Sequence, residues 1–133
     1  MQFSHEKLIV YQRSLEFVGF TNEVFKLCTT RINAHEHLDQ ASTSVSLNIA
    51  EGTGKYSGKD KCRFYDFARG SALECAAALD VLVVREKISN ELAQKGKNIL
   101  IEIVSMLVGL IKSSSDRVYE EGINYEATSD ETN

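Results

Sequence analysis

The chain has 133 residues, 43% of them hydrophobic and 26% charged, which fits one globular domain with a core of its own. Its three cysteines are odd in number and show no CxxC spacing, which argues against a disulfide framework or a zinc site. The net charge of −4 is unevenly distributed, because residues 116–133 hold six acids and one base. The remaining body therefore carries +1, and its charge does not exclude an anionic partner.

The start of the chain lacks the charged head and the apolar stretch of a signal peptide, so we expect a cytoplasmic protein. No apolar run reaches the ~18 residues typical of a membrane span. The nearest, residues 99–111, is interrupted by Glu102, Ser105 and Gly109, and we expect no membrane partner. The absence of proline allows long uninterrupted helices.

The first predicted helix spans about residues 5–29. Its apolar residues recur at intervals of three and four, as in a helix that packs in a bundle. The predicted core-facing positions are Leu8, Tyr11, Leu15, Val18, Asn22 and Phe25, widened by Phe17, Val24 and Leu27.

The second predicted helix spans about residues 34–52. Asn33 is a suitable N-cap, and Glu36 follows three residues later as in a capping box. Gly52 and Gly54 are expected to end the helix, because glycine tolerates the left-handed conformation common at helix C-termini. The core-facing positions step by three and four again: Leu38, Ala41, Val45, Asn48 and Gly52.

The third predicted helix spans about residues 58–86, with Ser57 as N-cap and Asp60 at its third position. A stripe of alanines lies beside the predicted core face on the same helix. The face comprises Phe64, Phe67, Ser71, Cys75, Ala78 and Leu82, and the stripe comprises Ala68, Ala72 and Ala76.

The fourth predicted helix spans about residues 90–118, opening near Ser89 and Asn90. Its centre is apolar nearly all round, and Glu102, Ser105 and Gly109 form one narrow polar stripe. A helix that buries only one face in a bundle needs less apolar surface than this. We therefore expect a second buried face against another chain, and an acidic, disordered tail over residues 120–133.

Four amphipathic helices with short connections predict an all-α fold, an up-down-up-down antiparallel four-helix bundle with a left-handed twist, over residues 1–119. In this arrangement Ser71 and Glu74 should lie beside Ser44 or Ala41. We expect Asn48 to bond to a helix-terminal or loop backbone group. Glu51 is expected to bind loop amides or a basic residue, either Arg63 or Arg69.

Catalytic chemistry is not evident in the sequence. A di-iron bundle would need two Glu-x-x-His motifs, and the chain has none. The glycines around Lys55 do not match a phosphate-binding loop, which requires a preceding strand and a Ser or Thr after the lysine. We expect no enzyme activity, no catalytic residue, no metal and no cofactor.

A basic group, Lys55, Lys59, Lys61 and Arg63, surrounds the predicted turn between the second and third helices. Residues 53–69 hold five bases and two acids, a net charge of +3. In a homo-oligomer this charge would repeat and could meet phosphates. An ordinary solvated loop is the more common explanation of such a cluster.

The blocks SVSLNIAEGTGK at residues 44–55 and FARGSALE at residues 67–74 carry a family resemblance. With LIVYQ at residues 8–12, they resemble the S23-type proteins encoded in intervening sequences of bacterial 23S rRNA genes. The resemblance covers roughly residues 5–115. The motif positions are Asn48, Glu51, Gly52, Gly54, Arg69, Ser71 and Glu74.

The resemblance implies a left-handed four-helix bundle whose relatives form homopentameric rings. One related group, the accessory variability determinant of diversity-generating retroelements, works with a reverse transcriptase and RNA and is strongly basic, unlike this chain. The sequence thus favours a non-enzymatic homo-oligomeric scaffold or adaptor that binds RNA or an RNA-handling protein. The alternative is a protein–protein interaction module that binds no nucleic acid.

Overall fold

The computed structural model describes the backbone of residues 1–125 and the side chains of residues 1–115. It contains a short 3₁₀-helix, η1 (Ser4–Lys7), and four long helices, α1 (Ile9–Lys26), α2 (Asn33–Thr53), α3 (Gly58–Val84) and α4 (Asn90–Tyr125). The described part of the chain has no strand, and the predicted all-α class is confirmed.

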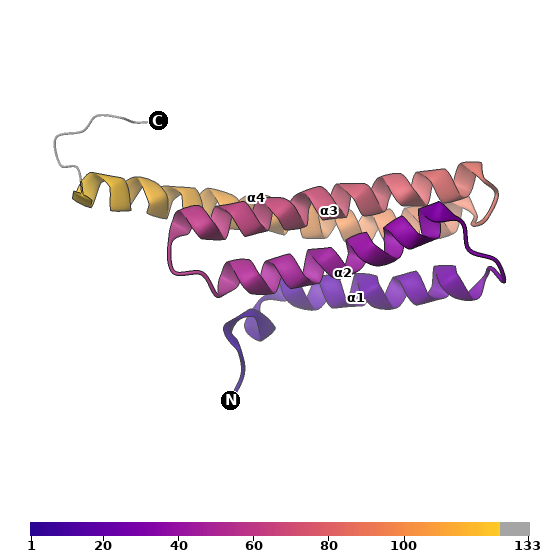
Figure 1. Cartoon of the computed structure of the whole chain (residues 1–133), viewed down its shortest axis with the longest axis horizontal. Helices are drawn as coiled ribbons and strands as arrows, with labels where there is room; N and C mark the ends of the chain where they lie inside the picture. Colours follow the sequence, from indigo (N-terminus) through magenta and orange to yellow (C-terminus); the bar gives the residue numbers. More distant parts are fainter. Residues whose placement is uncertain (126–133) are drawn as a thin grey trace.

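The four long helices lie side by side along the long axis of the molecule (Figure 1). The α1–α2 and α3–α4 connections are at one end and the α2–α3 connection is at the other, so consecutive helices run in opposite directions. Each helix packs against two others, in the cyclic order α1, α2, α3, α4. The left-handed twist stays a prediction.

The core is built from aliphatic and aromatic side chains of all four helices. Burying each large apolar side chain contributes roughly 1.5–3 kcal/mol, so this layer is the main source of stability. The largest fully buried apolar side chains are Phe17, Leu38, Ile49, Leu79, Leu82, Ile103 and Leu107.

The first predicted helix is interrupted. Leu8 is extended, with φ −80° and ψ 131°, and separates η1 from α1. The preceding turn is held by rings that contact one another, since His5 stacks on Phe3 with ring centroids 5.8 Å apart and meets Tyr11 edge-on at 4.6 Å. The helix also ends at Lys26, before the predicted residue 29.

The core-facing positions predicted for α1 and α3 are partly wrong. In α1 the buried stripe is Val10, Ser14, Phe17, Phe20, Thr21 and Val24. Of the predicted positions, Phe17 and Val24 are therefore buried, and the others are half-buried or exposed. In α3 Ala68 and Ala72 of the alanine stripe lie in the core, Ala76 is half-buried, and Phe67 is on the surface. Both helices carry two neighbouring apolar stripes, and tertiary packing decides which one faces inward.

The predicted cap at Ser57 is observed, and Ser89, at the expected start of the fourth helix, acts as a further cap. The Ser57 hydroxyl accepts a hydrogen bond from the Asp60 amide at 3.1 Å, and Ser89 does the same for Leu92 at 3.1 Å. Asn33, however, is the first helical residue rather than the cap. His35 acts there instead, because its Nδ1 accepts from the Ile32 amide at 3.0 Å.

Helix ends differ from prediction at α3 and α4. The chain leaves α3 through Glu86, whose φ of 62° is left-handed, while the Lys87 amide donates to the Leu82 carbonyl at 2.8 Å. This is a Schellman-type end with glutamate where glycine is usual. Helix α4 continues to Tyr125, so residues 120–125 of the predicted disordered tail are helical. Residues 126–133 lie outside the described part.

Candidate functional site

Helix α4 has one core-facing stripe and two flanks with different surfaces. Its buried residues again step by three and four and pack between α1 and α3. This spacing is that of a heptad stripe in a bundle. The stripe comprises Ala93, Gly96, Leu100, Ile103 and Leu107.

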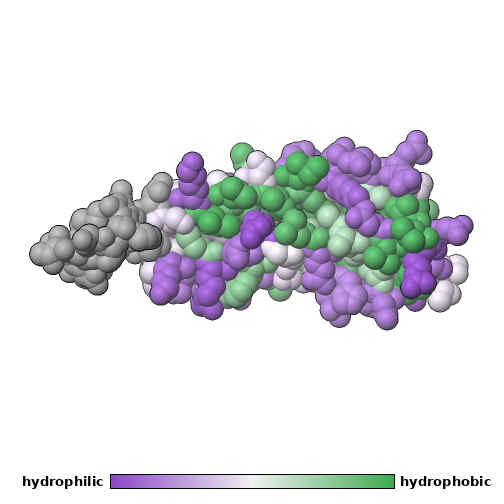
Figure 2. All heavy atoms as spheres, turned by 90° about the horizontal axis from the view of Figure 1, so that it is seen from above, coloured by the Kyte–Doolittle hydropathy of each residue, from purple (hydrophilic) through white to green (hydrophobic). Residues whose placement is uncertain are grey.

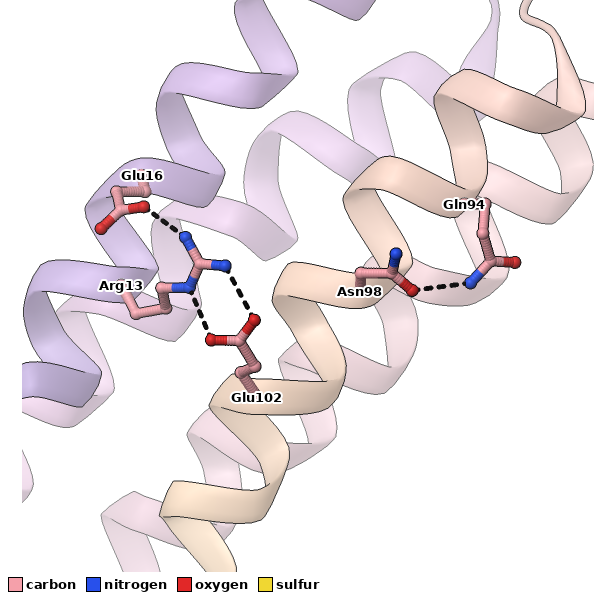
Figure 3. Close-up of polar contacts among 5 residues, drawn as sticks. All are labelled: Arg13, Glu16, Gln94, Asn98 and Glu102. Carbon is pink, nitrogen blue, oxygen red and sulfur yellow. Dashed lines mark hydrogen bonds and ion pairs between the residues drawn. The ribbon is translucent and has the colours of Figure 1, made fainter.

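The middle of the flank of α4 toward α1 is polar (Figure 3), whereas near the start of α1 an apolar groove of about 430 Å³ is lined by Ile9 and Met106. Arg13 of α1 donates to both carboxylate oxygens of Glu102, at 3.1 and 2.9 Å, and also contacts Glu16. Hydrogen bonding from Arg13 lowers the pKa of Glu102 below its ordinary value. One to two turns away, Lys95 pairs with Glu23 at 3.2 Å. Of the predicted polar stripe, Glu102 thus joins α4 to α1, whereas Ser105 lies on the side of α4 toward α3.

The flank of α4 toward α3 is apolar and hollowed. A groove of about 540 Å³ runs between the two helices, with Leu73 and Ala76 on one side and Ile101 and Val104 on the other. Figure 2 shows this face, where hydrophobic residues gather over α3 and α4 and hydrophilic ones border them. We call this surface the α3/α4 groove.

Large apolar side chains of the α3/α4 groove remain open to solvent. Leu73 is 51% exposed and Ile101 is 63% exposed, and one turn beyond lies Val108, which is 50% exposed. Toward one end, Lys97 and Asp80 form an ion pair across the groove. Contiguous exposed apolar patches of this kind mark interaction surfaces, which agrees with the second buried face expected of this helix.

By length and composition alone, α4 could also cross a membrane, since an 18-residue window within Asn90–Ser115 has a mean hydropathy of 1.4. It is the one such helix in the described part of the chain. The helix nevertheless packs in the bundle and pairs through Glu102 and Lys95 with α1. The expectation of no membrane partner stays a prediction.

Asn48 and Ser71 belong to one hydrogen-bonded group between α2 and α3. The Asn48 amide donates to the Ser44 carbonyl and to the Ser44 hydroxyl, both at 2.9 Å. The Ser71 hydroxyl donates to the same Ser44 oxygen at 2.9 Å. Ser71 therefore lies beside Ser44 as predicted, but Asn48 binds within its own helix and not at a helix end or loop.

The acidic motif residues separate. Glu74 contacts His37, with the carboxylate 3.0 Å from Nδ1, and so bridges α3 and α2 on the surface. Glu51 is exposed and forms no ion pair among the described side chains, which makes the predicted pairing wrong. Its expected partners are engaged elsewhere, since Arg63 lies 3.7 Å from Asp60 and Arg69 binds Asp66 at 2.8 Å.

The two motif glycines have unequal roles. A Cβ at Gly52 would come within 2.9 Å of the Tyr65 ring and 3.1 Å of the Phe64 Cβ, so only glycine permits this approach of α2 to α3. A Cβ at Gly54 would make only ordinary contacts, and Gly54 has a right-handed φ of −83°. The predicted left-handed helix end at these glycines is therefore wrong.

The predicted basic group does lie together around the α2–α3 connection. The Lys55 ammonium sits 4.7 Å from the Phe64 ring centroid, and Arg63 sits 4.8 Å from the same centroid. Lys61 donates to the Thr53 carbonyl at 2.9 Å and so caps the end of α2. Lys59 is exposed and has no ion pair among the described side chains. We call these four residues the basic loop.

The described side chains offer no alternative chemical centre. No three His, Cys, Asp or Glu groups in that part of the chain lie close enough to share a metal ion. Burial raises the pKa of the Cys75 thiol to about 12, which makes it unreactive. His35 is buried with Nε2 unpaired, and desolvation, with Arg31 and Lys87 nearby, lowers its pKa.

Sequence reasoning missed three features of this surface. The groove depends on Leu73 of α3, which the helix pattern places outside both predicted stripes. Phe67 was predicted in the core but is exposed beside the basic loop. The cap formed by His35 had one available signal, its position three residues after Ile32.

The described part of the chain is an all-helical bundle with an apolar groove between α3 and α4. The sequence model of the 23S rRNA-intervening sequence protein family matches residues 6–109. The chain belongs to this family. It is also similar to a crystallised protein of unknown function from the S23 ribosomal protein family of Bacteroides thetaiotaomicron VPI-5482.

The similarity to that crystal structure covers most of both molecules. The TM-score is 0.73 and the sequence identity is 25%, over 78% of this chain and 99% of the other. No curated protein matches the sequence. The family resemblance drawn from the motif residues is thus confirmed, together with the helical fold.

Proposed function

We propose that the protein is a non-enzymatic cytoplasmic scaffold whose copies associate through the α3/α4 groove. The observation that carries this proposal is the difference between two sides of α4. The side toward α1 forms ion pairs with that helix, and the side toward α3 is apolar and exposed to solvent. A specific interface needs a contiguous apolar centre with a polar rim. Leu73, Ile101 and Val104 supply the centre, and the Lys97–Asp80 pair supplies part of the rim.

Association would multiply the charge of the basic loop. Each copy carries +3 over residues 53–69, and a ring would repeat this charge around its axis. The family resemblance favours five copies. The repeated basic loop is suited to RNA phosphates or to an RNA-handling protein with an acidic surface.

Assembly is tested by sedimentation velocity of an Ile101→Lys variant. A charge in the centre of the interface should dissociate the oligomer, because a buried unpaired charge is costly. Leu47→Lys is the matched control, since Leu47 is 60% exposed on α2 and lies outside the groove. An Ile101→Lys protein that sediments like the wild type would remove the proposed interface.

RNA binding is tested by filter retention of a labelled ribosomal RNA fragment across a salt series. The double variant Lys55→Glu/Lys59→Glu should abolish retention, whereas Lys61 is left intact because it caps α2. Lys26→Glu is the control, since Lys26 ends α1 and the α1–α2 connection lies at the opposite end of the bundle (Figure 1). Absence of retention at low salt would favour the alternative, a protein–protein module without nucleic acid.

A further inference from the structure

We propose, on the basis of the RNA-binding role above, that the basic loop binds unpaired nucleotides rather than a duplex. Tyr56 and Phe67 would stack on bases, while Lys55 and Lys59 contact the adjoining phosphates. This assigns a ligand class to a surface for which sequence reasoning gave only charge.

Two aromatic side chains of this region are open to solvent. Tyr56, in the α2–α3 connection, is 95% exposed, and Phe67, on the third turn of α3, is 48% exposed. Phe67 is held edge-on against the half-buried Phe64 ring, with centroids 5.7 Å apart. An exposed ring that is fixed by a neighbour is a ready surface for a second flat group.

Two cations lie against the Phe64 ring, which Phe67 contacts. Lys55 and Arg63 lie within 5 Å of the Phe64 centroid, at 4.7 and 4.8 Å, and Arg63 is also 6.0 Å from the Phe67 centroid. Arg63 is only loosely paired with Asp60, at 3.7 Å. Aromatic and positively charged side chains are thus neighbours at Lys55, Arg63, Phe64 and Phe67, and Tyr56 directly follows Lys55 in the chain.

This combination of exposed rings and cations distinguishes unpaired nucleotides from duplex RNA. In a duplex the base faces are covered by neighbouring base pairs, and only phosphates and groove edges are accessible. Exposed rings gain nothing from such a ligand. Unpaired nucleotides offer both a π-face and a phosphate, and proteins that bind them combine stacking aromatics with a basic groove. Stacking is tolerant of base identity, so we expect little sequence preference.

Fluorescence anisotropy with a labelled oligouridylate of about 12 nucleotides, a typical single-strand site length, tests the inference against a blunt RNA duplex of the same length. The wild type should bind the oligouridylate more tightly than the duplex. Tyr56→Ala should weaken oligouridylate binding about tenfold and leave duplex binding unchanged, and Tyr56→Phe should retain affinity because the ring remains. Tyr56 is almost fully exposed, so these variants should fold like the wild type.

The outcomes separate this inference from the proposed function. If Lys59→Glu weakens binding but Tyr56→Ala and Phe67→Ala do not, RNA binding stands and base stacking is overturned. Equal affinity for the duplex and the single strand also overturns it. If neither RNA binds at low salt, the RNA-binding role itself fails and the stacking inference falls with it.

Discussion

The two flanks of α4 differ in how completely a single chain covers them. Toward α1, Arg13 and Glu102 close the surface with a two-point hydrogen-bonded pair, and Lys95 joins Glu23 further along. Toward α3, the α3/α4 groove leaves Ile101 and Leu73 open to water. A monomer gains nothing from the second arrangement.

The difference teaches that ion pairs to a neighbouring helix can close one flank of a very apolar helix within a single chain, while its apolar excess stays exposed on the other flank. Glu102 is on the α1 side because Arg13 meets it there, and the apolar excess is left on the opposite side. Exposed ion pairs contribute little stability, typically below about 1 kcal/mol. Their role here is to keep one flank compatible with water, while the other flank is available to a partner.

The largest expected effect on the fold comes from adding a methyl group at Gly96, where α4 packs closely against Phe20 of α1. A Cβ at Gly96 would lie 2.4 Å from the Phe20 ring and 3.0 Å from Leu79, so Gly96→Ala must displace these core side chains. Overpacking of this kind should lower the free energy of unfolding by roughly 1–3 kcal/mol, measured by urea denaturation.

Gly109→Ala is the matched control on the same helix, because nothing lies within 4 Å of the added Cβ. It should leave stability unchanged or raise it by up to about 1 kcal/mol, the helix-propensity difference between alanine and glycine. Equal destabilisation by the two substitutions would show that the packing of Phe20 against Gly96 does not limit the approach of α1.

A smaller effect is expected from breaking the Arg13–Glu102 ion pair between α1 and α4. A double-mutant cycle of Arg13→Ala and Glu102→Ala should give a small favourable coupling at neutral pH and low salt, because the Glu102 side chain is largely exposed and solvent screens the pair. The pKa of Glu102 is lowered in the folded state. The coupling should therefore be present above the ordinary pKa of 4.5 and disappear as the pH falls through the lower folded value.

Salt should weaken the interaction on the α1 flank and leave association through the α3/α4 groove intact. Raising the ionic strength screens the Arg13–Glu102 coupling, but it does not weaken association through the apolar groove. A coupling energy that is independent of salt and acid would mean that these two side chains pack together without interacting as charges.

The smallest expected effect on the fold of one chain comes from Ile101→Ser on the open flank. Because Ile101 is largely exposed in the single chain, its replacement should change the unfolding free energy of the isolated subunit by no more than about 0.5 kcal/mol. The wild-type thermal midpoint should rise with protein concentration, since association stabilises the folded state, and the midpoint of the variant should not. A concentration-dependent midpoint in the variant would place the interface elsewhere.

The architecture could be predicted because it depends on patterns that the sequence states directly. Helix-period apolar stripes and the cap at Ser57 predicted four helices with nearly correct limits. The apolar excess of α4 predicted a second face buried against another chain; the single chain has an exposed groove there, and its burial stays a prediction. These features follow from local propensity and from total apolar area, which do not require knowledge of the packing.

The details that failed depend on tertiary choice. Phe17 and Val24, predicted only to widen the stripe of α1, are at its centre because α2 and α4 meet that side of the helix. Asn48 was expected at a helix end, yet Ser44 one turn earlier offers two acceptors at once. Spacing along a helix identifies neighbouring side chains, but it does not determine which of several polar partners is used.

The proposed scaffold role requires that copies of the chain associate in solution. Static light scattering of the wild-type protein at micromolar concentration measures this association directly. We predict a mass that is a multiple of the 14.8 kDa chain, and five copies on the basis of the family resemblance. A mass of 14.8 kDa that does not change with concentration would contradict the proposal. It would mean that the apolar flank of α4 stays open to water in the working protein.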